Sequence, residues 1–371
     1  MISCQYSNGN ISRLASLTSA FLVISGCAAL DPELFSDSRR MAVGAGTPVP
    51  VAGETQAVGT TRADAADDPE IWVDPRDPSR GVILGTDKQA GLYVYGFDGA
   101  VRAFIPDGRL NNVDLRGGFP TPQGERVLVA ASDRGRMGAA LYLLNPDTLE
   151  LTPWGLVPLD LTEPYGLCMG RRAHTGDYVV IVNSTDGQVR QVRVSADTQG
   201  RVVTHEERRF GLATQVEGCV VDDARGRLYI GEEARGVWQF DLNAPDEGRL
   251  VAEAPSAMLV PDVEGLTLLH DGTESFLIAS SQGDSAFAVW RADGPELAYL
   301  GRFSPAAANG VDGVTGTDGV AALGGQVGPF PAGLVVMQDD VDAEGEEAST
   351  RRARQNYKLV DWREVRRALG F

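Results

Sequence analysis

Lysine is nearly absent from this chain of 371 residues: Lys88 and Lys358 are the only two, and arginine carries almost all of the positive charge. Histidine and cysteine are also sparse and scattered, which argues against a zinc site, because such a site needs clustered ligands of these types. The sequence contains no Gly-Lys-Ser/Thr phosphate loop and no Gly-x-Ser-x-Gly nucleophile motif. The 51 acidic residues outnumber the 33 basic ones and give a net charge of −18 at pH 7, which argues against a nucleic-acid partner. A chain this acidic points instead to high solubility or to bound cations.

The apolar run from Leu14 to Gly26 follows Arg13 and is too short to span a bilayer, so it is typical of the core of a signal peptide. It ends in Ile-Ser-Gly before Cys27, a pattern that resembles a bacterial lipobox, in which the cysteine becomes the lipidated first residue of the mature chain. We interpret residues 1–27 as a signal peptide with a lipobox, and cleavage by an ordinary signal peptidase nearby is the alternative. Either way, the protein is expected to be exported.

The residue after Cys27 is Ala28 rather than Asp, which favours an outer-membrane anchor in a Gram-negative cell. We therefore expect an outer-membrane or periplasmic lipoprotein, otherwise a secreted protein, that meets the membrane only through its lipid anchor. Residues 28–60 are rich in Ala, Gly, Pro, Thr and Val without periodicity and are interpreted as a flexible tether. Cys168 and Cys219 can pair outside the cytoplasm, but the sequence alone leaves their pairing open.

Six loosely similar units of roughly 46–54 residues follow from Asp64 onward, a spacing typical of propeller repeats. Each unit opens with a polar or acidic residue before a short apolar strand, and the openings begin at Asp67, Asn111, Glu163, Gln215, Asp262 and Thr317. A second strand is expected at residues 81–85, 126–131, 178–183, 227–231, 275–280 and 333–337. A third strand is expected at residues 91–95, 140–144, 189–194, 237–240, 286–290 and 357–362.

These segments are rich in β-branched and aromatic residues and are bounded by Gly, Asp, Asn and Pro, as strands are. Helical periodicity is missing except at residues 362–369. The sequence therefore predicts an all-β protein, a six-bladed β-propeller over residues 61–371. A pair of β-sandwiches is the alternative, but it would not explain why acidic residues recur at the same place in each unit.

Carboxylates recur where the first strand of each unit begins, and in a propeller these strands line the central channel. The residues at these positions are Asp67, Asp68, Asp114, Glu217, Asp262, Glu264 and Asp318. The ends of the second strands add Glu232, Glu233 and Asp339, and the loop before the sixth unit adds Asp312. Such a rim would repel itself at pH 7 unless cations lay between the acids. Oxygen ligands without His or Cys favour Ca²⁺ or Mg²⁺, and a loose set of carboxylates favours Ca²⁺. Taken singly, each acid could equally be a solvated turn residue.

Six motifs between about Glu54 and Trp362 resemble those of the β-propeller phytases. They are Asp64-Ala-Ala-Asp-Asp-Pro-Glu-Ile-Trp-Val-Asp-Pro, Gly108-Arg-Leu-Asn-Asn-Val-Asp-Leu-Arg, Glu217-Gly with Gly226-Arg-Leu-Tyr-Ile-Gly-Glu-Glu, Asp262-Val-Glu-Gly-Leu, Ser280-Ser-Gln-Gly and Thr317-Asp-Gly. The resemblance implies a hydrolase of the 3-phytase type that releases phosphate from myo-inositol hexakisphosphate (phytate) with the help of several Ca²⁺ ions. We expect it to act as a monomer on small inositol phosphates.

Carried over to this chain, the resemblance implies a catalytic calcium site formed by Asp67, Asp68, Asn112, Asp114, Glu217, Glu233, Asp262, Glu264 and Asp312, with Asp318 as a further calcium ligand. Substrate phosphates would contact Lys88, Arg134 and Tyr165. Asp339 and Glu54 would hold structural calcium. A water held between calcium and a carboxylate would attack phosphorus in line, so that no protein nucleophile is needed.

The third unit departs from the family pattern, because Thr185-Asp186 stands where the family usually has Lys-Glu. One phosphate-binding charge is missing there, which puts affinity for a second phosphate of the substrate in question. Two other functions stay open. One is a calcium-dependent propeller hydrolase of the lactonase type, which lactone turnover without phosphatase activity would indicate. The other is a non-enzymatic binding propeller, which calcium-dependent melting without turnover would indicate.

Overall fold

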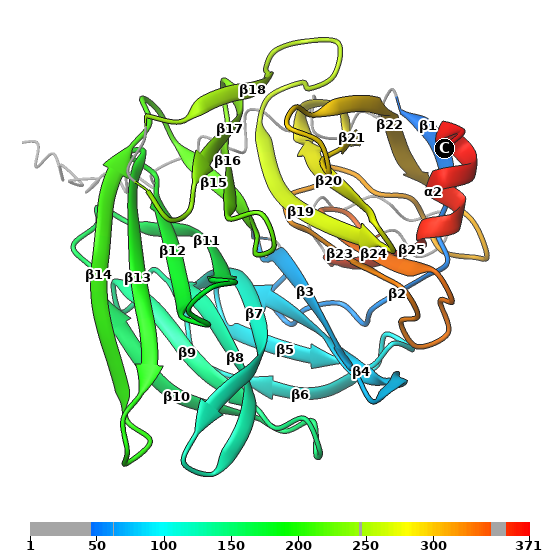
Figure 1. Ribbon diagram of the computed structural model, residues 1–371. Helices are drawn as coiled ribbons and strands as arrows, with labels where there is room; N and C mark the ends of the chain where they lie inside the picture. The colour runs from blue at the N-terminus through cyan, green and yellow to red at the C-terminus, as the bar shows by residue number, and fades with distance from the viewer. Residues whose placement is uncertain (1–45, 62, 245–246, 343–353) are drawn as a thin grey trace, which may run out of the picture. The chain divides into compact units, whose positions relative to one another are not determined.

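The computed structural model describes residues 46–61, 63–244, 247–342 and 354–371. In this part of the chain, six sheets of mainly antiparallel strands stand around a common axis as the blades of a β-propeller (Figure 1). The inner strands of successive blades contact one another in chain order, and the last inner strand contacts the first, so the ring is closed. The predicted six-bladed propeller is confirmed. The predicted signal peptide with its lipobox lies outside the described residues.

Blades 1 to 3 take their four strands from consecutive stretches of the chain. Blade 1 comprises β3 (Ala66–Asp74), β4 (Asp77–Asp87), β5 (Gly91–Tyr95) and β6 (Val101–Ile105). Blade 2 comprises β7 (Leu110–Thr121), β8 (Gly124–Asp133), β9 (Gly138–Leu144) and β10 (Leu151–Pro158). Blade 3 comprises β11 (Pro164–Arg171), β12 (Tyr178–Ser184), β13 (Gln188–Ala196) and β14 (Val202–Gly211).

Blades 4 to 6 continue the order, and blade 6 has only three strands from this end of the chain. Blade 4 comprises β15 (Val216–Asp222), β16 (Arg227–Glu232), β17 (Gly236–Asp241) and β18 (Arg249–Glu253). Blade 5 comprises β19 (Val263–Asp271), β20 (Glu274–Ser281), β21 (Ala286–Arg291) and β22 (Ala298–Ala306). Blade 6 comprises β23 (Val320–Gly324), β24 (Gly333–Asp339) and β25 (Asn356–Asp361).

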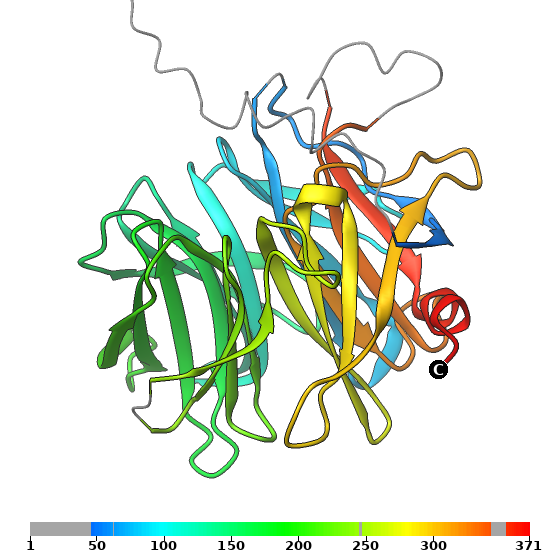
Figure 2. The same cartoon turned by 90° about the horizontal axis from the view of Figure 1, so that it is seen from above.

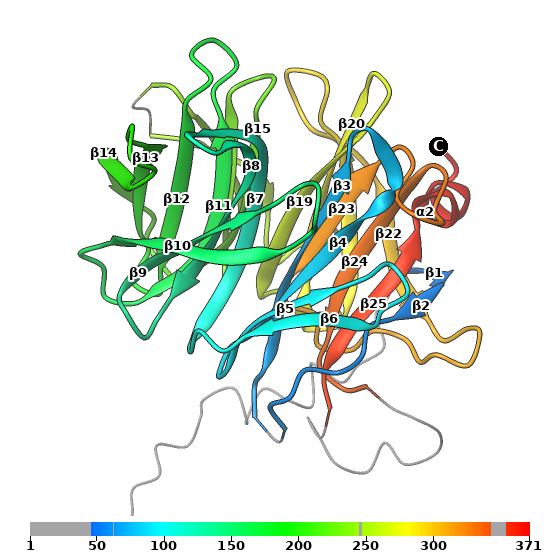
Figure 3. The ribbon, with the colours of Figure 1, turned by 90° about the horizontal axis from the view of Figure 1, so that it is seen from below.

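Two short strands near the N-terminal end of the described chain complete the last two blades. β1 (Thr47–Pro50) adds in parallel to β22, and β2 (Gly53–Glu54) pairs antiparallel with β25 as the outer strand of blade 6 (Figure 3). Val49 and Val51 are fully buried here. The prediction of a flexible tether up to residue 60 is therefore wrong for residues 47–54. Strands of two and four residues are too short to leave a periodic pattern in the sequence.

Apolar side chains fill the space between neighbouring blades. Between blades 1 and 2, for example, Trp72 and Leu84 share one buried cluster with Val113, Val129 and Tyr142. Full burial of a side chain of this kind stabilises the fold by about 1.5–3 kcal/mol, so contacts between blades are the main source of stability.

The predicted helix at residues 362–369 is also confirmed. Asp361 is the N-cap residue of helix α2 (Trp362–Leu369), and its carboxylate accepts a hydrogen bond from the backbone N–H of Arg363. The helix buries Trp362 and Val365 and lies against blades 5 and 6 (Figure 2). No helix in the described part of the chain is both long and apolar enough to cross a membrane.

A disulfide joins Cys168 in β11 to Cys219 in β15, with 5.5 Å between the two Cα atoms. The pairing that the sequence left open therefore exists, and it links the inner strands of blades 3 and 4.

Candidate active site

The inner strands of blades 1 to 5 share one irregularity. Near its start, each carries a β-bulge in which two residues face a single residue of the second strand. The bulged pairs are Asp67-Asp68, Asn111-Asn112, Tyr165-Gly166, Glu217-Gly218 and Glu264-Gly265. In blade 6, Asp318-Gly319 holds the same place immediately before β23. Because a bulge interrupts the alternation of a strand and re-aims its side chains, it places a chosen side chain at the channel. We call the first residues of the six pairs the bulge ring: Asp67, Asn111, Tyr165, Glu217, Glu264 and Asp318.

In every blade but the fourth, where Gly231 faces the bulge, a polar side chain of the second strand bonds to the backbone at a bulge. Thr86 Oγ1 accepts from the N–H of Asp68 at 3.1 Å. Ser132 Oγ accepts from the N–H of Asn112 at 3.0 Å and donates to the carbonyl of Tyr165 in the next blade. Asn183 and Ser280 likewise donate to carbonyls of the next blade, those of Glu217 and Thr317, and Gln338 accepts from the N–H of Asp318. These bonds satisfy backbone groups that the bulge leaves outside the regular ladder.

Glycine occupies the second position of four of the six pairs because the next blade approaches closely there. A Cβ on Gly166 would lie 1.8 Å from the carbonyl oxygen of Glu217, and a Cβ on Gly218 would lie 2.0 Å from that of Glu264. In blade 1 the second residue is Asp68, whose Oδ2 accepts from the N–H of Val113 at 3.0 Å. Asp68 therefore joins blade 1 to blade 2, and it also lines the cavity in the channel.

Glu217, Glu233 and Glu264 form the first carboxylate group, in which one oxygen from each lies within 4.8 Å of the others. Burial raises the pKa of Glu264 well above its ordinary value, and the charges of Glu217 and Glu233 raise it further. Burial also raises the pKa of Glu217, although a hydrogen bond with Glu264 partly offsets this effect. Burial and mutual repulsion therefore make it costly to ionise both carboxylates unless a positive charge lies beside them.

Lys88 lies buried beside the bulge ring and faces three carboxylates. Its Nζ is 2.9 Å from Asp64 Oδ2, 2.9 Å from Asp318 Oδ2 and 3.2 Å from Asp67 Oδ1. Burial alone would lower the pKa of Lys88, but Asp318, Asp64 and Asp67 outweigh it, so the pKa is raised and the ammonium stays charged. Burial raises the pKa of Asp67 despite the charge of Lys88. One lysine thus balances only part of this acidic surface.

The three residues predicted to contact substrate phosphates lie together. Arg134 Nη2 donates to the carbonyl of Lys88 at 2.9 Å, and Tyr165 is close enough to Lys88 to affect its pKa. In the third blade, Asp186 Oδ2 accepts from Thr162 Oγ1 at 2.5 Å, and this bond is the main reason that the pKa of Asp186 falls to about 2. This turn between β12 and β13 therefore contributes a carboxylate that is bound to the loop before β11.

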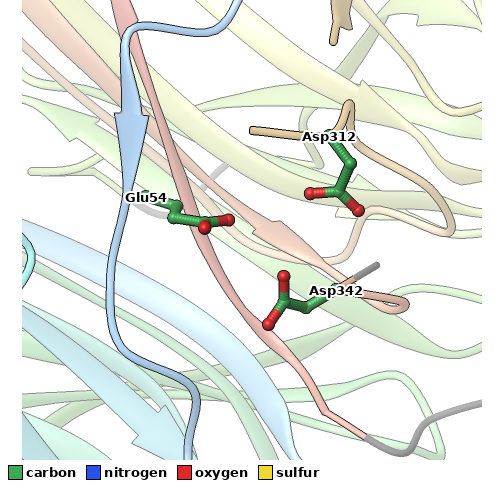
Figure 4. A group of neighbouring side chains, drawn as sticks. All are labelled: Glu54, Asp312 and Asp342. Carbon is green, nitrogen blue, oxygen red and sulfur yellow. The ribbon is translucent and has the colours of Figure 1, made fainter. Parts of the chain in front are cut away.

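A second carboxylate group lies where the N-terminal strand β2 meets blade 6. Glu54, Asp312 and Asp342 point toward one another, each with an oxygen within 4.8 Å of the others (Figure 4). The buried Nζ of Lys358 lies 2.5 Å from Glu54 Oε2 and 3.4 Å from Asp342 Oδ1, and it also contacts Asp312. Asp339 is 3.4 Å from the same ammonium. Asp312, which was predicted to lie in the catalytic calcium site with Glu217, therefore lies instead with Glu54, a residue assigned to structural calcium, because its loop lies against β25 and not at the bulge ring.

Asp114 belongs to a third set, deeper in the channel. Its Oδ1 accepts from Arg116 Nη1 at 2.8 Å and its Oδ2 accepts from the N–H of Met169 at 2.7 Å, so it ties blade 2 to blade 3. Arg116 also binds Asp223. Burial and Asp114 raise the pKa of the neighbouring Glu70. These residues line a cavity of about 430 Å³ in the channel. The sequence placed Asp114 at the rim because it could not show that Arg116 and the Met169 backbone already occupy both of its oxygens.

The remaining predicted residues lie near the first group. The N–H of Val263, which follows Asp262, donates to the carbonyl of Glu233, and Asn112 accepts from the side chain of Asn111. Sequence reasoning missed three polar residues that hold this region together, namely Asp64, Asn111 and Gln282. All three stand inside the family motifs, so position in the motif was the available signal. It also missed Lys358, which binds the second carboxylate group and lies in none of these motifs.

The donor set of the first group fits a hard divalent cation. All its ligand atoms are carboxylate oxygens, which suit Ca²⁺. Among the described residues, Asp67 Oδ2 and Glu264 Oε2 are buried without a hydrogen-bond partner. Buried polar atoms are rarely left in this state, and a bound cation would satisfy both oxygens.

The sequence profile of the family described as Phytase matches residues 12–371. The 3-phytase of Bacillus subtilis (strain 168) is 34% identical over 318 residues, which cover 83% of this chain and 82% of that protein. Two solved structures are also similar in backbone. One, described as the structure of U3-55K, has a TM-score of 0.45 and 12% identity over 84% of this chain and 99% of its own. The other, a nidogen/laminin complex, has a TM-score of 0.43 and 14% identity over 74% of this chain and 86% of its own.

Proposed function

The chain belongs to the phytase family, and on that premise we propose that it is a calcium-dependent phytase that releases phosphate from phytate. The observation that carries the calcium dependence is the first carboxylate group. Three glutamates with oxygens within 4.8 Å of one another, of which Glu217 and Glu264 are buried and Glu233 is half-buried, are costly to keep charged unless a cation lies among them. Glu217, Glu233 and Glu264 would hold this ion, with Asp67 and Asp318 next to it.

The substrate is a polyanion, whereas the protein is strongly acidic. Calcium, when bound, would supply positive charge to the phosphate oxygens and activate water for attack on phosphorus. Arg134 would bind phosphate through its charge, because its neighbour Lys88 is already committed to three carboxylates. Tyr165, from the bulge of the next blade, would border the same phosphate. These side chains would fix the orientation of the substrate, which lowers the entropic cost of reaction.

The second group has a different role in this proposal. Glu54, Asp312 and Asp342, with Asp339 nearby, would hold a structural calcium ion that fastens β2 to blade 6. Lys358 already supplies one positive charge there. The group lies at the outer part of the blade, where an ion would act on stability rather than on chemistry.

We further propose that the protein is an exported lipoprotein anchored through Cys27. The disulfide between Cys168 and Cys219 supports export, since such bonds persist in oxidising compartments. Labelling of cells with radioactive palmitate should mark the full-length chain. A Cys27→Ser chain that still takes up palmitate would contradict the anchor.

The test of function is phosphate release from calcium phytate at pH 7–8, with and without EDTA. Activity should disappear on chelation and return with added Ca²⁺. The variant Glu217→Gln should lose roughly 100-fold or more in kcat/KM. Glu150→Gln, an exposed carboxylate outside the channel, serves as the matched control and should behave as the unaltered protein. Activity that survives thorough chelation would contradict calcium dependence, and a folded Glu217→Gln protein with full activity would remove the site assignment.

A further inference from the structure

Asn111 is the one uncharged amide of the bulge ring, and the family-based site assignment passes over it in favour of Asn112. Its side chain is fully buried. Its Nδ2 donates to Glu217 Oε1 at 2.7 Å and to Asn112 Oδ1 at 3.0 Å. Because the carboxylate of Glu217 accepts and does not donate, the N–H side of the amide must face it.

We propose that Asn111 is a positioning residue that fixes the rotation of the Glu217 carboxylate within the first carboxylate group. The inference rests on the proposed function in that it assigns the group to a divalent cation. Glu217 is held from two directions: Asn183 Nδ2 donates to its backbone carbonyl at 2.7 Å, and Asn111 holds its side chain. The backbone bond sets the bulge, and the side-chain bond sets the carboxylate.

The choice of an amide at this position follows from the charges around it. An aspartate here would place another carboxylate within hydrogen-bond distance of Glu217, in a group that already holds three glutamates. A leucine would fill a similar volume but would leave Glu217 Oε1 without its donor. Asparagine combines the donor with zero net charge, so it orients Glu217 without adding to the repulsion or competing with the cation.

Loss of a hydrogen-bonding partner of a metal ligand usually lowers metal affinity or activity by about 10–100-fold. We therefore expect Asn111→Leu to raise the dissociation constant for Ca²⁺ alone, measured by calorimetric titration, by about that factor. Gln191→Leu is the matched control, since Gln191 is also a buried amide but donates to the carbonyl of Leu242, away from the channel. It should lose thermal stability in EDTA to a similar extent while keeping its calcium affinity.

A double-mutant cycle with Glu217→Gln separates positioning from general damage. Once Glu217 is altered, Asn111→Leu should have little further effect on Ca²⁺ binding. Fully additive losses, or a calcium affinity within about twofold of the unaltered protein, would overturn the proposal. Should Asn111→Leu not fold, Asn111→Ser replaces it in the same cycle, because serine is too short to reach Glu217. A protein that shows this coupling but does not hydrolyse phytate would contradict the proposed function alone.

Discussion

Replacement of Lys358 by methionine tests whether one internal ammonium holds the N-terminal strand to blade 6. Lys358 is fully buried and faces Glu54, Asp312, Asp339 and Asp342. One ion pair at 3.4 Å with an effective dielectric constant near 20 is worth about 5 kcal/mol, and desolvation of the ammonium offsets part of the sum. Deletion of one partner of a buried ion pair typically costs about 3–5 kcal/mol. At about 2 °C per kcal/mol for a domain of this size, the melting temperature in EDTA should fall by about 6–10 °C.

The assay is thermal unfolding followed by circular dichroism at pH 8, in EDTA and in excess Ca²⁺. Calcium should reduce the difference between Lys358→Met and the unaltered protein, because a divalent ion can neutralise the same carboxylates. Arg102→Met is the control: its pair with Asp98 is more than half exposed on both sides, so its loss should cost less than about 1 kcal/mol. A Lys358→Met protein that melts within about 1 °C of the unaltered one in EDTA would refute the reasoning.

Three further predictions follow from described contacts. Replacing both Cys168 and Cys219 by serine should cost about 4 kcal/mol in the free energy of unfolding measured with urea, since the bond closes a loop with a sequence separation of 51; an unchanged midpoint would contradict this. Gly319→Ala should lower the free energy of unfolding by about 1–3 kcal/mol, because its Cβ would lie 2.4 Å from Asp68 Oδ1. A urea midpoint equal to that of the unaltered protein would contradict this, since the neighbouring bulge would then move aside without cost. Burial raises the pKa of Asp339 to about 7, with Lys358 partly offsetting it, so the folded calcium-free protein binds this proton more tightly than the unfolded chain does. Its stability should therefore fall by up to about 4 kcal/mol as the pH rises from 4 to above 7, and a melting temperature in EDTA that rises over this range would be the contrary result.

The sequence was sufficient to predict the propeller because the inner and middle strands are apolar and recur at a regular spacing. The outer strands carry much weaker patterns: β14, for example, consists of exposed and half-buried residues and has no buried one. The strands β1 and β2 could not be predicted either, because their identity comes from partners more than 250 residues away. These residues form strands only because they pair with distant parts of the chain, and no local sequence pattern indicates such pairing.

For the site, the sequence supplied the residue types but not their partners. Glu217, Glu233 and Glu264 do come together, because the bulges of blades 4 and 5 re-aim Glu217 and Glu264, and Glu233 directly follows the second strand of blade 4. In the sequence, Asp114 looked equivalent to these glutamates as a calcium ligand. In the structure, its two carboxylate oxygens accept hydrogen bonds from Arg116 and from the backbone N–H of Met169. Whether an acid is available to a ligand depends on such contacts across blades, and these appear only when the ring closes.

The pairing of β2 with β25 also imposes an order on folding. Glu54 in β2 lies opposite Lys358 in β25, some 300 residues later in the chain. The strand β2 therefore cannot complete blade 6 until β25 has been made. Contacts of such long sequence separation form slowly. Until then blade 6 presents an open edge, whose unpaired N–H and C=O groups invite pairing with other chains. A molecule interrupted before β25 therefore lacks the strand with which β2 pairs, and aggregation competes with folding until β25 has been made.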